Sequence, residues 1–316
     1  MLKRSLNLFI IFTALLLSFE CRLNAQETAV PAVSAAADST ITIDKNNQMM
    51  LVFVERLKSG NYKEARKIAN EMAGFSNKYK DDAMTEYKSF YSDIEREYYL
   101  LKNKGSKKKV VWVPEPIADG YYFLAVMDFQ EKKYQDAVDN IQKCIIWNPV
   151  RAPYYCERGF IFLNSGIYAD YVSAQVAYEQ ALECADNEED FASALRGLGF
   201  SFAAMNQLEE SAAAMILSQK YVPDSPDAKE HLLRLKNLVP SFDFNMDTKK
   251  AKKILYDSKI QTTFSPEHAT VLLKLVNEMK MPDDKEKALA FLVSANRIDP
   301  GNKAVENKLK EIQKLK

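Results

Sequence analysis

Two histidines and four cysteines are the side chains of this sequence best suited to metal binding or nucleophilic catalysis, and they are widely spread. His231 and His268 lie near no cysteine and no cluster of carboxylates along the chain. A zinc site needs several such ligands together, and a catalytic triad needs a nucleophile in a recognisable setting. We therefore expect both histidines on the surface or at helix ends. We predict a protein that is not an enzyme, with no metal and no cofactor.

Two short stretches look like ligand-binding loops but lack required residues. Gly197 and Gly199 in RGLGFSF follow a helical pattern and no third glycine comes, so we predict no phosphate loop and assign Gly199 to helix packing. The stretch DFNMD, residues 243–247, alternates oxygen ligands as a calcium loop does at its start. Such a loop then needs a glycine and a late glutamate, where Thr248 and Ile254 stand.

The net charge argues against a nucleic-acid partner, whereas one local basic run leaves an anionic glycan or lipid as an alternative. Lys+Arg and Asp+Glu are both 43, so no net field favours nucleic acid. The only dense basic run is Lys107 to Lys109, with Lys104 nearby and Trp112 just beyond. It is either a solvated loop or a patch for anionic glycans or lipid head groups.

The first 25 residues are typical of a secretory signal peptide cleaved near Ala25. Lys3 and Arg4 precede an apolar run, Leu6 to Phe19, that is short for a membrane span. The alternatives are an uncleaved anchor and a lipidated Cys21, although Phe19 and Glu20 before Cys21 do not suit lipidation. We expect an exported protein of the periplasm or cell envelope, not membrane-spanning after cleavage, with peripheral envelope association possible. Residues 26–44 are small and polar, which predicts a flexible linker.

Three cysteines remain after the predicted cleavage, and an odd number does not form a disulfide framework. Cys144 and Cys184 fall on apolar helical stripes, which favours buried free thiols. A Cys144–Cys156 bridge is the alternative in an oxidising compartment.

One helical stripe recurs along the chain. Tyr134, Ala137, Ile141 and Cys144 share a helix face that ends at Pro149. Tyr168 follows Tyr134 by 34 residues, and Ala174 follows Ala137 by 37, so the second copy has a later second helix. The residues that we assign to packing between repeats are Tyr134, Ala137, Cys144, Pro149, Gly159, Tyr168, Ala174, Ala181, Gly199, Ser211, Pro223, Ala288, Ala295 and Pro300.

These units resemble tetratricopeptide repeats, which have a period of about 34 residues. The resemblance implies an all-α fold, a right-handed superhelical solenoid of antiparallel helix hairpins. Three tandem units cover residues 118–225, and a degenerate copy with a polar capping helix covers 265–316. Residues 226–264 are predicted to form connecting helices. The N-terminal copy and a long extra helix span 45–104, and a basic, proline-containing loop spans 105–117.

The resemblance also implies a concave groove, lined by the first helix of each hairpin, that binds a protein or peptide. The side chains expected there are Tyr122, Val126, Phe129, Cys156, Phe160, Leu163, Arg196 and Phe200. They lack the lysine and asparagine set with which some relatives clamp a terminal carboxylate, so we expect an apolar segment of a partner. The expected function is a non-enzymatic scaffold or adaptor of the bacterial cell envelope. The alternatives are glycan or lipid binding by Lys107 to Trp112, and a groove filled by the chain's own terminal helices.

Overall fold

The structure is a computed structural model, and it describes the backbone of residues 37–166, 170–239 and 246–315. This part is mostly helical, which confirms the all-α prediction, with one small two-stranded sheet that was not predicted. The predicted signal peptide, residues 1–25, lies outside the described residues, as does Tyr168. Within the described residues, no helix is both long and apolar enough to span a bilayer.

The chain divides into two compact units, Met1–Ile68 and Ala69–Lys316. The first unit contains α2 (Ala37–Lys58) and the start of α3 (Tyr62–Gly74). Helix α2 begins inside the predicted linker, so that prediction is wrong over residues 37–44. Apolar side chains three or four residues apart form a buried stripe along this helix, made of Met50, Phe53, Val54 and Leu57. Gly60, with φ of 73°, allows the tight turn into α3.

A two-stranded parallel ladder opens the second unit. After η1 (Phe75–Lys78), strand β1 (Thr85–Lys88) pairs with β2 (Lys109–Trp112), with Thr85 opposite Lys109. Between the strands, α4 (Asp93–Lys102) starts where the Ser92 side chain accepts a hydrogen bond from the Glu95 N–H. The predicted long helix over 79–104 is therefore wrong in its first half. The predicted loop over 105–117 is wrong at β2, because pairing between distant segments overrides local pattern.

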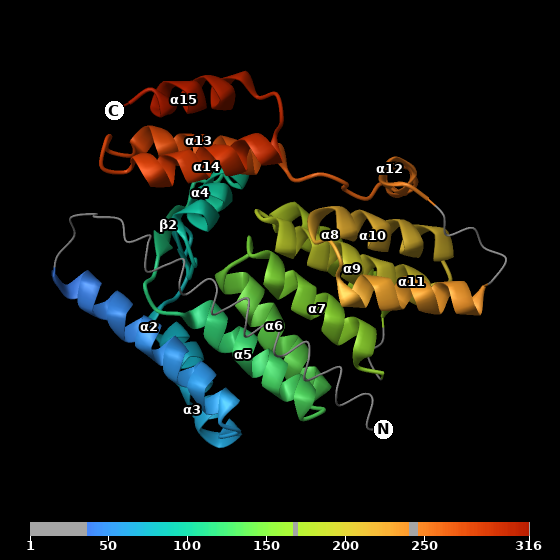
Figure 1. Cartoon of the computed structure of the whole chain (residues 1–316). Helices are drawn as coiled ribbons and strands as arrows, with labels where there is room; N and C mark the ends of the chain where they lie inside the picture. The colour runs from blue at the N-terminus through green and yellow to red at the C-terminus, as the bar shows by residue number, and fades with distance from the viewer. Residues whose placement is uncertain (1–36, 167–169, 240–245, 316) are drawn as a thin grey trace. The chain divides into compact units, whose positions relative to one another are not determined.

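The middle of the second unit consists of three antiparallel helix pairs (Figure 1). Neighbouring pairs also touch, through α6 with α7 and α8 with α9. The turn from α7 to α8 is longer than the turn from α5 to α6, as the delayed spacing of the second copy predicts. The pairs are α5 (Ile117–Gln130) with α6 (Tyr134–Trp147), α7 (Ala152–Asn164) with α8 (Tyr171–Cys184), and α9 (Glu188–Ala204) with α10 (Leu208–Tyr221).

Glycines permit the closest helix contacts. A β-carbon at Gly120 of α5 would lie 2.4 Å from the Ala73 backbone nitrogen in α3. One at Gly199 of α9 would lie 2.7 Å from the Met215 Cε of α10. Both distances are below van der Waals contact. The Ala73 nitrogen belongs to the backbone, so α5 could not approach α3 this closely with a larger residue at position 120, whereas the end of the Met215 side chain could move aside.

Five further helices follow in the described part of the second unit. Helices α11 and α12 pack against α10, α13 packs against both α14 and α4, and α15 packs against α14. Helices therefore occupy the segments predicted to hold connecting helices and a final hairpin, and the assignment of that hairpin to the repeat stays a prediction. Their bounds are α11 (Pro226–Leu238), α12 (Thr248–Asp257), α13 (Pro266–Glu278), α14 (Lys285–Ile298) and α15 (Lys303–Gln313).

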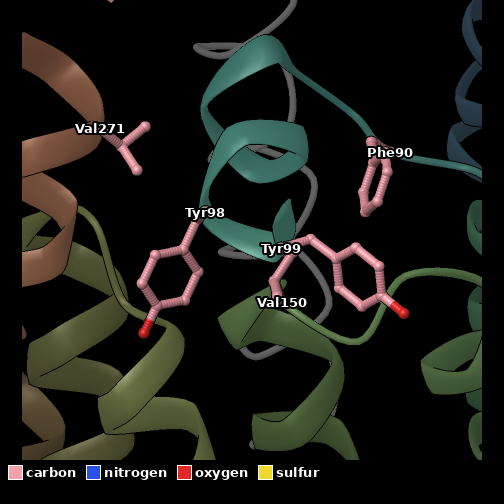
Figure 2. Packing of buried hydrophobic residues seen from close by; sticks show 5 residues of the cluster. All are labelled: Phe90, Tyr98, Tyr99, Val150 and Val271. Atoms are coloured by element: carbon pink, nitrogen blue, oxygen red, sulfur yellow. The ribbon is translucent and has the colours of Figure 1, made fainter. Parts of the chain in front are cut away.

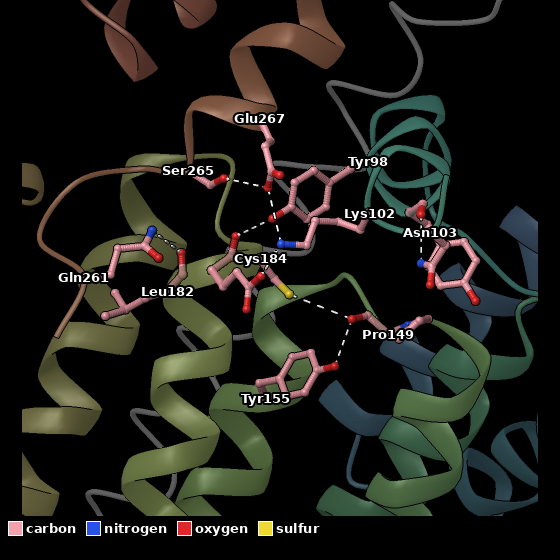
Figure 3. Close-up of polar contacts among 12 residues, drawn as sticks. Tyr98, Lys102, Asn103, Pro149, Tyr155, Leu182, Cys184, Gln261, Ser265 and Glu267 are labelled. Carbon is pink, nitrogen blue, oxygen red and sulfur yellow. Dashed lines mark hydrogen bonds and ion pairs between the residues drawn. The ribbon is translucent and has the colours of Figure 1, made fainter. Parts of the chain in front are cut away.

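Helix α4 joins the C-terminal hairpin to the helix pairs. Tyr98 and Tyr99 of α4 share a buried apolar cluster with Phe90, with Val150 before α7 and with Val271 of α13 (Figure 2). Polar contacts support the same junction: Lys102 Nζ donates to Glu183 Oε1 at 2.5 Å and to Glu267 Oε2 at 3.3 Å (Figure 3). Segments far apart in sequence are thus held together at one end of the helix pairs.

A buried ion pair lies at the same end. Arg151 Nη1 donates to Glu95 Oε1 at 3.3 Å, and Asn148 Nδ2 donates to Glu95 Oε2 at 2.6 Å. The Arg151 guanidinium also stacks 3.8 Å from the centroid of the Tyr91 ring. Burial raises the pKa of Glu95, and the charge of Arg151 acts in the opposite direction. This network fixes the junction between α4 and the start of α7.

Candidate functional site

Three first helices carry the predicted groove residues. Helix α7 contacts both α5 and α9, so these three helices are neighbours. We call the side chains they share the α5–α7–α9 face. It comprises Tyr122, Val126 and Phe129 of α5, Cys156, Phe160 and Leu163 of α7, and Arg196 and Phe200 of α9.

The α5 part of this face is covered, which corrects the prediction of an open groove there. Tyr122, Val126 and Phe129 are only 9%, 8% and 8% exposed. The Phe129 ring packs edge-on against Phe160, with centroids 5.1 Å apart, and the Tyr122 ring packs 5.3 Å from that of Tyr154. The predicted residues on α7 and α9 remain partly exposed. The accessible part of the face is therefore centred on α7 and α9.

Helix α11 limits the face at Phe200. The Phe200 ring meets the His231 ring edge-on, with centroids 4.7 Å apart. The Ser211 hydroxyl donates to the Gly199 carbonyl at 2.7 Å and lies 2.9 Å from His231 Nε2, so Nε2 is the donor to Ser211. Burial is the main cause that lowers the pKa of His231 to about 4. A later helix thus covers part of the face, although α11 is a connecting helix and not one of the terminal helices of the alternative prediction.

The prediction that both histidines lie on the surface or at helix ends is wrong for His231, which is buried in the middle of α11, and holds for His268 only in that it lies in the first turn of α13. His231 is 8% exposed and His268 is 2% exposed. The His268 ring stacks on Tyr98 with centroids 3.9 Å apart, in the junction between α4 and α13. Burial lowers the pKa of His268. Both rings are neutral packing groups near neutral pH.

A buried carboxyl group lies beside Cys156 on α7. Glu157 is 8% exposed, and its carboxyl oxygens are not among the fully buried atoms that lack a hydrogen-bond partner in the described part of the chain. Burial raises the pKa of Glu157 to about 7. The other buried acids each receive a side-chain donor: Glu97 from Lys274, Glu115 from Tyr79, Asp119 from Tyr154, Asp128 from Asn140 and Asp190 from Asn187.

Other polar groups surround Glu157. The negative charge of Glu157 contributes to raising the pKa of Tyr122 and of Tyr178, in both cases after burial. The Tyr122 hydroxyl is buried and has no hydrogen-bond partner among the described residues. Glu157 also contributes to the raised pKa of Cys156, whereas the charge of Arg196 on α9 acts in the opposite direction. Its Nη1 is buried and unpartnered within the described residues.

Sequence reasoning missed Glu157. An acid on a helix is normally solvated, so its type gave no reason to place it inside. The available signal was position, because Glu157 directly follows Cys156, which was assigned to the face.

The three cysteines of the described chain, Cys144, Cys156 and Cys184, are free, so no Cys144–Cys156 bridge forms. Burial raises the pKa of all three thiols, which keeps them protonated and unreactive. Across the described residues there is no group of His, Cys, Asp and Glu that could hold a metal ion.

Trp112, at the end of the basic stretch, contacts other residues of the same chain. Trp112 Nε1 donates to the Phe90 carbonyl at 2.9 Å, and the Arg96 guanidinium lies 5.7 Å from the Trp112 ring centroid. The side chain is 36% exposed. Lys107, Lys108 and Lys109 are exposed. Trp112 therefore has packing partners that account for its position.

The predicted packing residues occupy different environments. Tyr134 and Pro149 are partly exposed, and Pro223 and Pro300 are exposed, because they lie at helix ends. The buried residues are Ala137, Cys144, Gly159, Ala174, Ala181, Gly199, Ser211, Ala288 and Ala295.

Comparison with known proteins assigns this chain to no family. The chain matches no protein-family model, and no curated protein matches it.

Proposed function

We propose that this protein is a non-enzymatic scaffold of tetratricopeptide-like hairpins that binds a segment of a partner protein on its α5–α7–α9 face. The observation that carries the proposal is the succession of three antiparallel helix pairs whose first helices are neighbours. Such stacking, continued regularly, gives a solenoid with an extended binding surface. Partly exposed aromatic and aliphatic side chains on α7 and α9 supply the contact area.

The proposed setting is the cell envelope of a bacterium. The apolar, positively flanked start of the sequence supports export by a cleaved signal peptide. The near balance of acidic and basic residues supports a protein partner over a nucleic acid.

Replacing the aromatic side chains of the face tests the binding site. We expect Phe160→Ser with Phe200→Ser to leave the chain folded, because both residues are partly exposed, and to abolish capture of the partner from envelope extracts. Tyr256→Ser is the matched control, since Tyr256 is 74% exposed on α12, away from this face. If the folded double variant captures the same proteins as the wild type, the face is not the binding site.

Salt separates this proposal from binding through the lysine stretch. An apolar face loses little affinity when salt is raised, whereas contacts of Lys107, Lys108 and Lys109 with an anionic glycan or lipid weaken steeply. Binding that falls steeply with salt and survives the double substitution would favour the lysine stretch.

A further inference from the structure

The small sheet has two outer edges, and the outer edge of β1 is satisfied by the loop before it. Only β1 and β2 form the sheet within the described residues, so each strand pairs on one side. Successive residues of a strand point their backbone N–H and C=O groups to alternate sides. The outward residues of β1 are Thr85 and Tyr87. Their N–H groups donate to Asp82 Oδ1 at 2.7 Å and to Asp81 Oδ1 at 2.9 Å, respectively.

The outer edge of β2 has no such cover. Lys109 and Val113 donate their N–H groups toward β1, at 2.7 Å and 2.8 Å. By alternation, the backbone N–H and C=O groups of Val110 and Trp112 face away from β1. Within the described residues, neither Val110 nor Trp112 has a backbone hydrogen bond on that side. We call these two N–H donors and two C=O acceptors the β2 edge.

The β2 edge is placed to receive a third strand. Strand β1 contacts α6 as well as β2, which makes β2 the outer strand. The Trp112 side chain lies toward α4, where its Nε1 donates to the Phe90 carbonyl, and it is 36% exposed. Lys109 is exposed and projects from the opposite face of the sheet, because neighbouring side chains alternate. An added strand would therefore meet Trp112 on one face and Lys109 on the other.

The charge beside the β2 edge selects the kind of strand that fits. Lys104, Lys107, Lys108 and Lys109 are exposed, and no ion pair reaches them in the described part of the chain. Antiparallel pairing of two copies through this edge would bring the two sets of lysines together, and like charges on paired strands repel. A glycan or lipid head group could neutralise the lysines, but it has no row of amide donors and acceptors to pair with the edge.

We propose that the β2 edge binds an extended acidic segment of a partner protein, which adds to the sheet as a third strand. The backbone of the segment pairs with Val110 and Trp112, as in other proteins that bind peptides by strand addition. Its acidic side chains lie on the Lys109 face, and the apolar side chains between them contact Trp112. This surface shares no residue with the α5–α7–α9 face, and the inference does not depend on that face.

A random twelve-residue peptide library displayed on phage tests the charge preference with the full-length chain. We expect the wild type to select peptides in which acidic residues alternate with apolar ones. Lys107→Glu with Lys108→Glu should weaken binding of these peptides about tenfold or more, because two attractive charges become repulsive. Lys249→Glu with Lys250→Glu is the matched control, since it makes the same change of charge at exposed positions of α12. A library that yields no such acidic peptide would overturn the proposal.

Proline at position 110 tests the pairing of backbones. The N–H of Val110 points away from β1, so Val110→Pro removes no bond of the ladder but removes a donor from the β2 edge. We expect it to weaken binding of a selected peptide about tenfold or more. Val110→Ala is the matched control, because it loses similar packing against the Tyr99 cluster and keeps the N–H. Equal binding by the two variants would show that the lysines act without strand pairing.

Hydrogen exchange at single amides, followed by NMR, gives a readout that does not depend on substitution. In the free chain we expect the amides of Val110 and Trp112 to exchange faster than those of Lys109 and Val113, and the selected peptide should slow them about tenfold or more. Slow exchange of Val110 and Trp112 without peptide would mean that another segment of the chain covers the edge. If that protection increased with protein concentration, a second copy would be the occupant. Either result would overturn the proposal.

Discussion

Tyr178 of α8 packs directly against Gly197 of α9, so closely that a β-carbon at position 197 would lie 2.1 Å from the Tyr178 Cε1 atom. Gly159 of α7 lies against the same ring, where a β-carbon would lie 2.7 Å from Cε2 and 2.7 Å from Cζ. The ring therefore occupies the space between two helices of the binding face, and both glycines are required by its size.

Adding a methyl group at this contact should destabilise the protein. We expect Gly197→Ala to lower the free energy of unfolding by about 1–3 kcal/mol, because a packed aromatic ring must move. Chemical denaturation measures the change. Gly74→Ala is the matched control, since Gly74 has no neighbouring atom within 4 Å of the added carbon. Equal stability of the Gly197→Ala variant and the wild type would show that α8 and α9 do not pack in this way.

Removal of the charge of Glu157 should stabilise the protein in mild alkali. Its pKa is raised to about 7 in the folded chain, from an ordinary value of 4.5, so the folded state binds the proton more tightly. Stability is therefore lost as pH rises from about 4.5 through 7. We expect Glu157→Gln to be more stable than the wild type by about 1–3 kcal/mol at pH 8, with a smaller difference at pH 5. A Glu157→Gln variant less stable than the wild type at pH 8 would mean that the carboxyl group has a donor.

Acidification should weaken the packing of α11 through His231. The pKa of His231 is lowered to about 4, from 6.5, so the unfolded chain binds the proton more tightly. The stability that neutral His231 contributes to the fold is therefore fully present above about pH 6.5 and is lost as pH falls toward 4. We expect His231→Gln, which keeps a donor for Ser211, to lose less stability between pH 7 and pH 5 than the wild type. Urea denaturation at both pH values makes the comparison, and equal losses would contradict it.

The buried ion pair should contribute far more than exposed pairs. Arg151→Leu leaves the Glu95 carboxylate buried without its cationic partner, and we expect a loss of about 3–5 kcal/mol in unfolding free energy. Arg234→Leu is the control, because its pair with Glu230 on α11 is exposed, and it should cost less than about 0.5 kcal/mol. Similar costs for the two variants would show that the Glu95–Arg151 pair is solvated.

The helix pairs could be predicted because their pattern is local. Ala137 and Cys144 mark one face of α6 within two turns, and Gly159 marks the close approach on α7. The sheet could not be predicted, because β1 is four residues long and its partner lies 24 positions further along, at Thr85 opposite Lys109. A four-residue segment contains too few repeats of its hydrophobic pattern for a strand to be distinguished from a helix.

The candidate site was predictable only in outline. Spacing placed Phe160 and Phe200 on neighbouring helices, but it carried no information on what covers them. Gly197 was missed because the repeat assigns the close approach to Gly199, whereas the reach of Tyr178 across two helices depends on packing in three dimensions. Glu157 was missed for the same reason, since burial of an acid follows from its neighbours and not from its own type.

Photo-crosslinking in living cells tests the central claim most directly. A benzoylphenylalanine placed at Leu163, partly exposed on the α5–α7–α9 face, is compared with one at Val176, which is 45% exposed on α8. We expect a discrete crosslinked partner from position 163 and none from position 176. A partner captured from position 176 alone, or equally from both positions, would contradict binding on this face.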